Sequence, residues 1–238
     1  MNRPPHIALV LAGGQGCRMH SRCPKQFLEI EGEPIIVHTL RAFSLHPDID
    51  AIYVVCADEW RTCVCQWIEK FHITKFQKTF TSGHTSFQSL RNGIEGLKKD
   101  GLPPDSFIIT HEAVRPLISQ KVISDNLETC IRHGNATAAI PSEEAYMMST
   151  DGLQSEGFLP RETLFRAQTP QTFSLADLQN AFLEADRRGI TCSQSLYTLM
   201  AELNLYTLYI SRGETCNFKI TVPQDVEIYQ ALIRHHAQ

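Results

Sequence analysis

The sequence predicts an α/β fold, a doubly wound and mostly parallel sheet from which a β-hairpin arm protrudes. The first observation is that short apolar runs suited to buried strands recur along the 238 residues, each bounded by polar or turn residues. The second is that helix-length segments, with apolar residues three or four positions apart, lie between most of these runs. Alternating strands and helices are typical of a parallel sheet covered on both faces.

The expected elements follow one another along the chain in this alternation. The predicted strands are residues 7–11, 52–56, 107–110, 136–140 and 205–210. The predicted helices are residues 34–44, 59–71, 86–99, 121–133, 175–188, 193–203 and 223–235. Because ligands of such sheets bind beyond the carboxyl ends of the strands, we expect a site in the loops that follow them.

Residues 142–162 break the alternation. They are polar, rich in Ser, Glu and Gly, and contain a turn signal at Asp151-Gly152. This pattern predicts the protruding hairpin arm, and a plain surface loop is the alternative. The whole length, residues 1–238, fits one large α/β domain, although a second, small unit would also fit.

The loop after the first strand has the composition of a phosphate cradle. It reads Ala12-Gly13-Gly14-Gln15-Gly16-Cys17-Arg18-Met19 and is followed by Cys23-Pro24-Lys25-Gln26. Glycine lets backbone N–H groups approach an anion closely, and the two cations can neutralise its charge. A Walker loop would end in Gly-Lys-Ser/Thr, and a dinucleotide fingerprint would need Gly or Ala at Met19. The loop therefore predicts a nucleotide site of another kind, with a tight turn and solvated cations as the alternative.

Composition sets limits on the partners of the chain. The formal net charge is −4 and no run of Lys or Arg occurs, so we expect no nucleic-acid surface. No stretch approaches the ~18 apolar residues of a membrane helix, and the N-terminus leads into a strand, so we expect no membrane association and a cytoplasmic location. The eight cysteines lack paired spacing, and nothing supplies further ligands to Cys63-x-Cys65, so no metal site is predicted.

Four further motifs, taken with the first loop, resemble one family. They are Gly83-His84-Thr85-Ser86-Phe87-Gln88-Ser89, His111-Glu112-Ala113-Val114-Arg115-Pro116, Ala167-Gln168-Thr169-Pro170-Gln171 and Asn217-Phe218-Lys219-Ile220-Thr221. Their order over about residues 6–232 resembles the cytidylyltransferases of polyol phosphates, the 2-C-methyl-D-erythritol 4-phosphate and D-ribitol-5-phosphate enzymes. The resemblance implies a Rossmann-like nucleotidyltransferase fold, a homodimer, CTP and a polyol phosphate as substrates, and Mg²⁺ bound mainly through the CTP phosphates.

The resemblance also implies roles for individual residues. The catalytic residues would be Arg18, Lys25 and Lys219, which would stabilise charge on the reacting phosphates. CTP would be bound by Ala12, Gly13, Gly14, Gly16, Gly83, Ser89 and Ala113. The polyol phosphate would be bound by Glu112, Arg115, Thr169 and Thr191, with Arg161 reaching across a dimer interface. Three alternatives stay open: Lys219 as an exposed strand-end lysine, Ser89 as a helix cap, and Arg115 paired structurally with Glu112.

Four positions depart from the family pattern. Glu112 and Cys192 stand where the family usually has aspartate, Ser86 replaces an arginine, and Ala145 replaces a threonine. A lost hydrogen bond to a charged phosphate costs about 1.5–3 kcal/mol, which weakens or redirects acceptor binding without abolishing transfer. The sequence therefore predicts an altered acceptor preference. A different sugar- or polyol-phosphate acceptor and a catalytically impaired, nucleotide-binding paralogue are the other interpretations.

Overall fold

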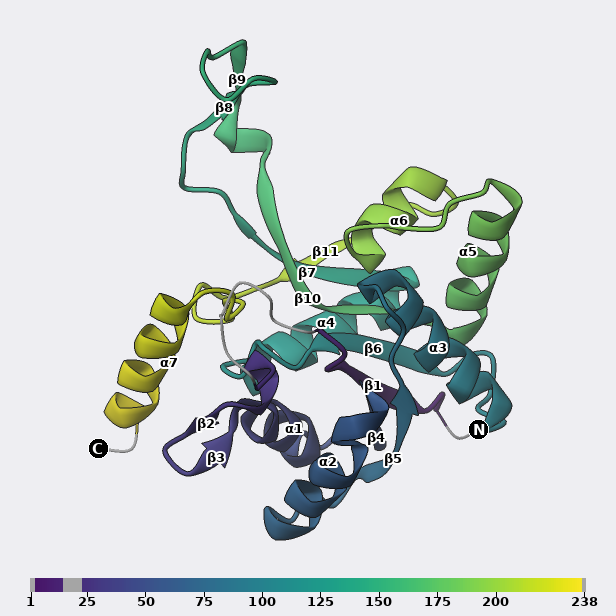
Figure 1. The fold of residues 1–238 in the computed structure, drawn as a ribbon. Coiled ribbons are helices and arrows are strands. Elements are labelled where there is room, and N and C mark those ends of the chain that lie inside the picture. Colours follow the sequence, from purple (N-terminus) through teal and green to yellow (C-terminus); the bar gives the residue numbers. More distant parts are fainter. Residues whose placement is uncertain (1–2, 15–22, 237–238) are drawn as a thin grey trace.

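A computed structural model describes residues 3–14 and 23–236 of the chain and contains a seven-stranded sheet (Figure 1). From one edge to the other its strands are β11 (Ile210–Arg212), β7 (Asn135–Pro141), β10 (Phe165–Ser174), β6 (Phe107–Glu112), β1 (His6–Leu11), β4 (Ala51–Cys56) and β5 (Phe76–Thr81). Strand β10 runs antiparallel to both of its neighbours, and the other pairings are parallel. The prediction of a mostly parallel sheet is confirmed.

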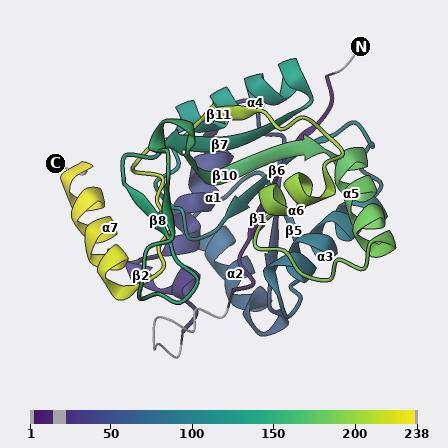
Figure 2. The ribbon, with the colours of Figure 1, turned by 90° about the horizontal axis from the view of Figure 1, so that it is seen from above.

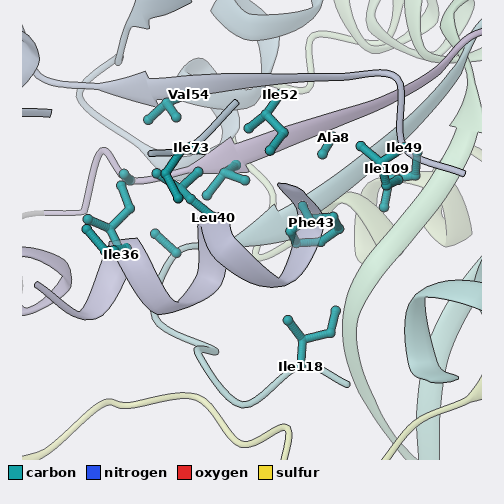
Figure 3. Packing of buried hydrophobic residues seen from close by; sticks show 14 of the residues in the cluster. Ala8, Ile36, Leu40, Phe43, Ile49, Ile52, Val54, Ile73, Ile109 and Ile118 are labelled. Atoms are coloured by element: carbon teal, nitrogen blue, oxygen red, sulfur yellow. The ribbon is translucent and has the colours of Figure 1, made fainter. Parts of the chain in front are cut away.

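Helices cover both faces of the sheet, because successive side chains of each buried strand point to opposite faces. Ala8 and Val10 pack with α1 (Ile35–Leu45), α2 (Asp58–Lys70) and α4 (Gln120–His133). Ile7 and Leu9 pack with α3 (Ser86–Lys99), α5 (Leu175–Arg187) and α6 (Leu196–Leu203). Figure 3 shows the first of these two cores, with α1 laid against the sheet. The doubly wound arrangement is therefore confirmed.

The segments after β1 and near the C-terminus form a smaller unit at one side of the molecule. It contains η2 (Lys25–Phe27), β2 (Glu29–Ile30), β3 (Glu33–Pro34) and α7 (Pro223–His236). Tyr229 of α7 is fully buried against Ile30, Ile35 and Val114. In both views α7 lies on the side of the molecule opposite α5 (Figure 1 and Figure 2). This packing brings the segment before α7 to the carboxyl end of the sheet.

Several elements differ from the sequence predictions. Strands β5 and β10 were not predicted, and the strand expected at residues 205–210 is wrong, because pairing with β7 begins only at Ile210. Before that residue, the Asn135 side chain donates to the Thr207 carbonyl (2.9 Å) and accepts from the Tyr209 N–H (3.1 Å). Helix α6 begins at Leu196 because the Ser195 hydroxyl caps it.

The predicted hairpin is present and projects from the body of the molecule (Figure 1). Strands β8 (Tyr146–Met148) and β9 (Gly157–Leu159) pair antiparallel, and β7 and β10 continue into the arm from its base. At the tip, the Asp151 carboxylate accepts from the N–H groups of Leu153 (2.8 Å) and Gln154 (3.0 Å), and Gly152 takes φ +73°. The short polar side chain and the glycine therefore make the turn.

Candidate active site

A cleft of about 870 Å³ opens at the carboxyl end of the parallel strands. The loops after β1, β4, β5 and β6 line it, as the strand-end argument predicts. The start of β10 reaches the same edge because that strand runs antiparallel, and the segment before α7 closes one side. The predicted site residues that line the cleft are Ala12, Gly13, Gly14, Lys25, Gly83, Ser89, Glu112, Arg115, Thr169 and Lys219.

Gln26 and Gly13 fix the described part of the phosphate loop. The buried Gln26 amide donates to the carbonyls of Ala12 (2.6 Å) and Gly14 (2.8 Å), which orients the backbone at the end of β1. A Cβ on Gly13 would lie 2.5 Å from the Ser82 Cβ, so only glycine allows this close approach of the loops after β1 and β5. A Cβ on Gly14 would meet nothing within 4 Å, and Gly14 borders the open cleft.

Lys25 begins the 3-10 turn η2 and lines the cleft, although most of its side chain is buried. The next aromatic residue, Phe27, stacks on Trp60 of α2 with ring centroids 4.6 Å apart. This stack anchors the turn, and with it Lys25, to the body of the sheet. Two predicted site residues of the same loop, Gly16 and Arg18, lie outside the described residues.

Ser89 holds the loop after β5 and does not cap helix α3. The Ser89 hydroxyl oxygen accepts from the Gly83 N–H (3.1 Å) and donates to the Thr85 carbonyl (2.9 Å). Thr85 is the N-cap of α3, since its hydroxyl oxygen accepts from the Gln88 N–H (3.1 Å). The alternative in which Ser89 caps the helix is therefore wrong. Ser89 shapes a loop whose backbone faces the cleft.

Glu112, Arg115 and Lys219 form a charged cluster on the wall of the cleft. The Lys219 ammonium contacts Glu112 Oε1, and Arg115 Nε donates to Glu112 Oε2 (2.8 Å). Arg115 Nη1 also donates to the Asn217 carbonyl (2.8 Å). Burial of Glu112 would raise its pKa, but the two cations outweigh it and lower the pKa to about 2. The ion pair between Arg115 and Glu112, which the sequence left open as an alternative, is therefore present, and both residues line the cleft.

A bend in β10 brings polar groups to this cluster. The pairing of β10 with β7 shifts register between Ala167 and Gln171, and Gln168 and Thr169 line the cleft there. The Asn217 amide donates to the Thr169 carbonyl (2.8 Å), and the Gln168 amide donates to the Glu214 carbonyl (2.9 Å). These bonds tie the segment before α7 to the sheet and thereby place Lys219.

Three residues that hold the loops of the cleft were not singled out from the sequence. Gln26, Gln168 and Asn217 each lie inside or beside a motif that was noted, but their contacts are with backbone carbonyls elsewhere in the chain. An amide side chain one or two positions from a predicted site residue was the available signal.

Of the predicted site residues that the structure describes, three do not line the cleft of their own chain. Ala113 is fully buried, and its N–H donates to the Leu11 carbonyl (3.0 Å) while its carbonyl accepts from Thr39 Oγ1 (2.8 Å), so neither group is available to CTP. Thr191 is exposed, and Arg161 lies on the arm beside Glu162. Over residues 3–14 and 23–236, no three His, Cys, Asp or Glu side chains gather as they would around a metal ion.

The fold and the cleft define a class. An α/β sheet that presents glycine backbone and two lysines to a cleft beyond its strand ends is typical of an enzyme that binds phosphate-bearing ligands. The family model for 2-C-methyl-D-erythritol 4-phosphate cytidylyltransferase matches residues 6–235. The chain belongs to this family, which confirms the resemblance noted in the sequence, and it is a CTP-dependent cytidylyltransferase.

Individual relatives match over nearly the whole chain. The chain is 34% identical over 229 residues to the ribitol-5-phosphate cytidylyltransferase of Lacticaseibacillus paracasei, covering 95% of this chain and 97% of that protein. The enzyme of the same name from Streptococcus agalactiae is 34% identical over 228 residues, covering 95% and 94%. Among solved structures, a 4-diphosphocytidyl-2C-methyl-D-erythritol synthase superposes with a TM-score of 0.79 at 25% identity, covering 97% of this chain and 100% of that one. The 2-C-methyl-D-erythritol 4-phosphate cytidylyltransferase of Thermus thermophilus gives 0.74 at 25% identity, covering 97% and 99%.

Within the part of the chain that the structure describes, no helix combines the length and the apolar composition needed to cross a membrane.

Proposed function

We propose that this chain transfers a cytidylyl group from CTP to ribitol 5-phosphate, giving CDP-ribitol and pyrophosphate. The observation that carries the proposal is the cluster of Glu112, Arg115 and Lys219, which faces the glycine loop and Lys25 across one cleft. It offers cations to two phosphate-bearing substrates at once. The acceptor is taken from the relatives at 34% identity, which are named for ribitol 5-phosphate.

The chemistry needs alignment and charge neutralisation more than a strong base. An oxygen of the acceptor phosphate forms a bond to the α-phosphorus of CTP, the bond from that phosphorus to the bridging oxygen breaks, and pyrophosphate leaves. A phosphate monoester has a second pKa of ~6 and is largely dianionic near neutral pH, so its oxygen is already a nucleophile. Lys25 and Lys219 would stabilise the negative charge that gathers on the reacting phosphates.

Arg115 is placed to hold the acceptor phosphate. Its Nε donates to Glu112 and its Nη1 to the Asn217 carbonyl, which leaves further N–H groups of the same planar fork for a ligand. A guanidinium fixed in this way can bind two phosphate oxygens in a defined orientation. Glu112 thus orients both Arg115 and Lys219, and we propose that it acts through them.

Mg²⁺ belongs to the proposal as an ion carried by the nucleotide. Mg²⁺ in nucleotide sites keeps several waters and phosphate oxygens and takes only one or two protein carboxylates. The triphosphate would carry this ion, so we assign none of the described side chains to it. When bound, it would neutralise part of the triphosphate charge. The cytoplasmic location expected from the sequence is also part of this proposal.

The proposal is tested by pyrophosphate release. We expect the pure protein, supplied with CTP and Mg²⁺, to release pyrophosphate with ribitol 5-phosphate and to form a CDP-polyol of matching mass. UTP in place of CTP, and ribitol without phosphate, are the controls. Release with 2-C-methyl-D-erythritol 4-phosphate alone would support the second candidate. CTP binding with no release from either acceptor would overturn both.

The second candidate acceptor is 2-C-methyl-D-erythritol 4-phosphate. It is supported by the family model and by the solved structures at 25% identity, which are named for that phosphate or for its cytidylyl product. The identity is lower than for the ribitol-phosphate enzymes, so we place it second.

We further propose that residues 1–238 act as one domain and that residues 142–162 are its dimerisation arm. Side chains at the arm are apolar and exposed: Met147 is 79% exposed, Phe158 75% and Leu153 88%. Exposed apolar side chains gathered on one projection mark an interaction surface. Arg161 on the same arm does not line the cleft of its own chain, so it would serve the cleft of a second copy.

The arm proposal is tested on the cross-strand pair Met147 and Phe158. The double variant Met147→Lys, Phe158→Glu removes the apolar surface while opposite charges face each other across the hairpin. We expect a monomer in sedimentation that binds CTP but releases pyrophosphate at least about tenfold more slowly, the effect of ~1.4 kcal/mol. Leu183→Lys, on the exposed side of α5, is the matched control. A verified monomer with full activity would contradict the proposal.

A further inference from the structure

His111 is a buried side chain of the cluster region to which no role has been given. It lies in β6 directly before Glu112, and its ring is fully buried. Its Nδ1 is 3.0 Å from the Thr169 hydroxyl oxygen, and its Nε2 is 3.2 Å from the Arg115 carbonyl oxygen. Phe43 packs against the ring in an edge-to-face arrangement, with centroids 5.1 Å apart. The imidazole therefore bridges two segments that line the cleft.

The partners of His111 determine its tautomer. Burial lowers the pKa of the ring to about 3, so it is neutral near neutral pH and carries one N–H. The Arg115 carbonyl can only accept, so the N–H is on Nε2. Nδ1 is then an acceptor, and the group that faces it is the Thr169 hydroxyl, which must donate.

This assignment uses the only proton of the Thr169 hydroxyl. The same oxygen accepts from the Glu112 backbone N–H (3.2 Å), so the hydroxyl is engaged both as donor and as acceptor inside the protein. Oxygens of a phosphate dianion are acceptors and need a donor. Thr169 lines the cleft but has no proton left for an acceptor phosphate.

The same network reaches Arg115 from two directions. His111 holds its backbone carbonyl, while the Asn217 carbonyl holds its guanidinium, and the Asn217 amide in turn donates to the Thr169 carbonyl (2.8 Å). Both ends of Arg115 are thus tied to one residue of β10. Glu112, whose carboxylate is the other partner of the guanidinium, is also tied to Thr169, because its backbone N–H donates to the Thr169 hydroxyl oxygen.

We infer that His111 is a positioning residue of the transfer reaction: with Thr169 it fixes Arg115 and Glu112 for the acceptor phosphate, and the Thr169 hydroxyl supports this frame instead of binding that phosphate. The inference rests on the proposed function, because the phosphate-binding role of Arg115 comes from there. It predicts that damage to the frame weakens acceptor binding and leaves CTP binding intact.

Two amide variants separate the two bonds of the ring. His111→Gln can place an N–H near the position of Nε2 and keep the bond to the Arg115 carbonyl, whereas His111→Asn can reach only Thr169. We expect His111→Asn to raise KM for ribitol 5-phosphate about tenfold, the effect of one lost buried hydrogen bond, with KM for CTP changed less than about twofold. His111→Gln should restore most of the loss. Equal KM values for the acceptor in His111→Asn and the parent enzyme, or equal losses for both substrates, would overturn the inference.

A spectroscopic measurement tests the frame without any turnover. The ¹⁵N spectrum of the His111 imidazole in the unliganded protein should show the Nε2–H tautomer, and the Nδ1 resonance should move in Thr169→Val but not in Thr169→Ser. An Nδ1–H tautomer would overturn the inference, even if His111→Asn does not fold. If no acceptor is used by the enzyme, the proposed function fails, and the spectrum alone then decides whether the His111 frame stands.

Discussion

Lys219→Met is expected to lower kcat for pyrophosphate release by about 10²–10³-fold, the usual effect of removing one preorganised electrostatic group from a site. Methionine keeps an unbranched side chain of similar length but carries no charge. The Lys219 ammonium is held against Glu112 on the wall of the cleft, so its position is set before substrates arrive. A charge that is fixed in advance costs no reorganisation when the reacting phosphates become more negative. Steady-state kinetics with CTP and acceptor varied separately would measure the loss.

The changes in kcat and in KM distinguish between possible roles of Lys219. Lys219→Arg, which keeps a cation, should recover part of kcat, and Lys98→Met, on the exposed end of α3, is the matched control. A raised KM with unchanged kcat would mean that Lys219 binds ground state and transition state equally. Unchanged kcat and KM would make Lys219 an ordinary exposed strand-end lysine, which was the alternative left open by the sequence.

The location of the cleft could be predicted because it depends on local patterns. An apolar run followed by Ala12, Gly13 and Gly14 predicts a strand that ends in a loop, and the predicted strand at residues 107–110 leads into another motif. The rule that parallel strands present their carboxyl ends at one edge then brings the two motifs together. No contact between distant residues had to be known for this step.

Strand β10 could not be predicted for a physical reason. Its segment Ala167-Gln168-Thr169-Pro170-Gln171 is polar, yet the structure buries most of it, because each polar side chain finds a partner. Hydrophobic periodicity does not register such a strand, since burial there is stabilised by hydrogen bonds rather than by apolar area. The edge strand β5 was not predicted for a different reason, since most of its polar residues, Gln77, Lys78 and Thr81, face solvent.

The contacts between side chains of the cleft could not be predicted from the sequence either. Lys219 meets Glu112 across 107 positions, and Arg115 meets Asn217 across 102. Nothing in the local pattern of either residue identifies its partner. Ala113 is a residue for which the motif alone misleads. It belongs to the motif that resembles the family, but its N–H and its carbonyl are hydrogen-bonded to Leu11 and Thr39 inside the protein.

Glu112→Gln is expected to lower the free energy of unfolding by about 3 kcal/mol at pH 7, and the difference should shrink in acid. The two cations outweigh burial and hold the pKa of Glu112 at about 2 in the folded protein, below its ordinary value of 4.5. A depressed folded pKa stabilises the protein above the unfolded pKa, and this contribution is lost as pH falls through the folded value. Urea unfolding of both proteins between pH 7 and about pH 3 would measure the difference, which should narrow below about pH 4.5.

The control for this experiment is Glu31→Gln, which removes an exposed carboxylate paired with Arg234 and should leave the pH profile close to that of the parent. A difference in the free energy of unfolding between the parent and Glu112→Gln that stays constant over the whole pH range would show that the carboxylate does not act through its charge.

Equal stability of Glu112→Gln and the parent at pH 7 would contradict the expected loss and would show that the carboxylate gives no net stabilisation. Removing the charges of a buried ionic cluster from water can cost as much as their attraction returns. In that case the Glu112 cluster is kept for the placement of Lys219 and Arg115, and its loss should appear in the kinetics instead.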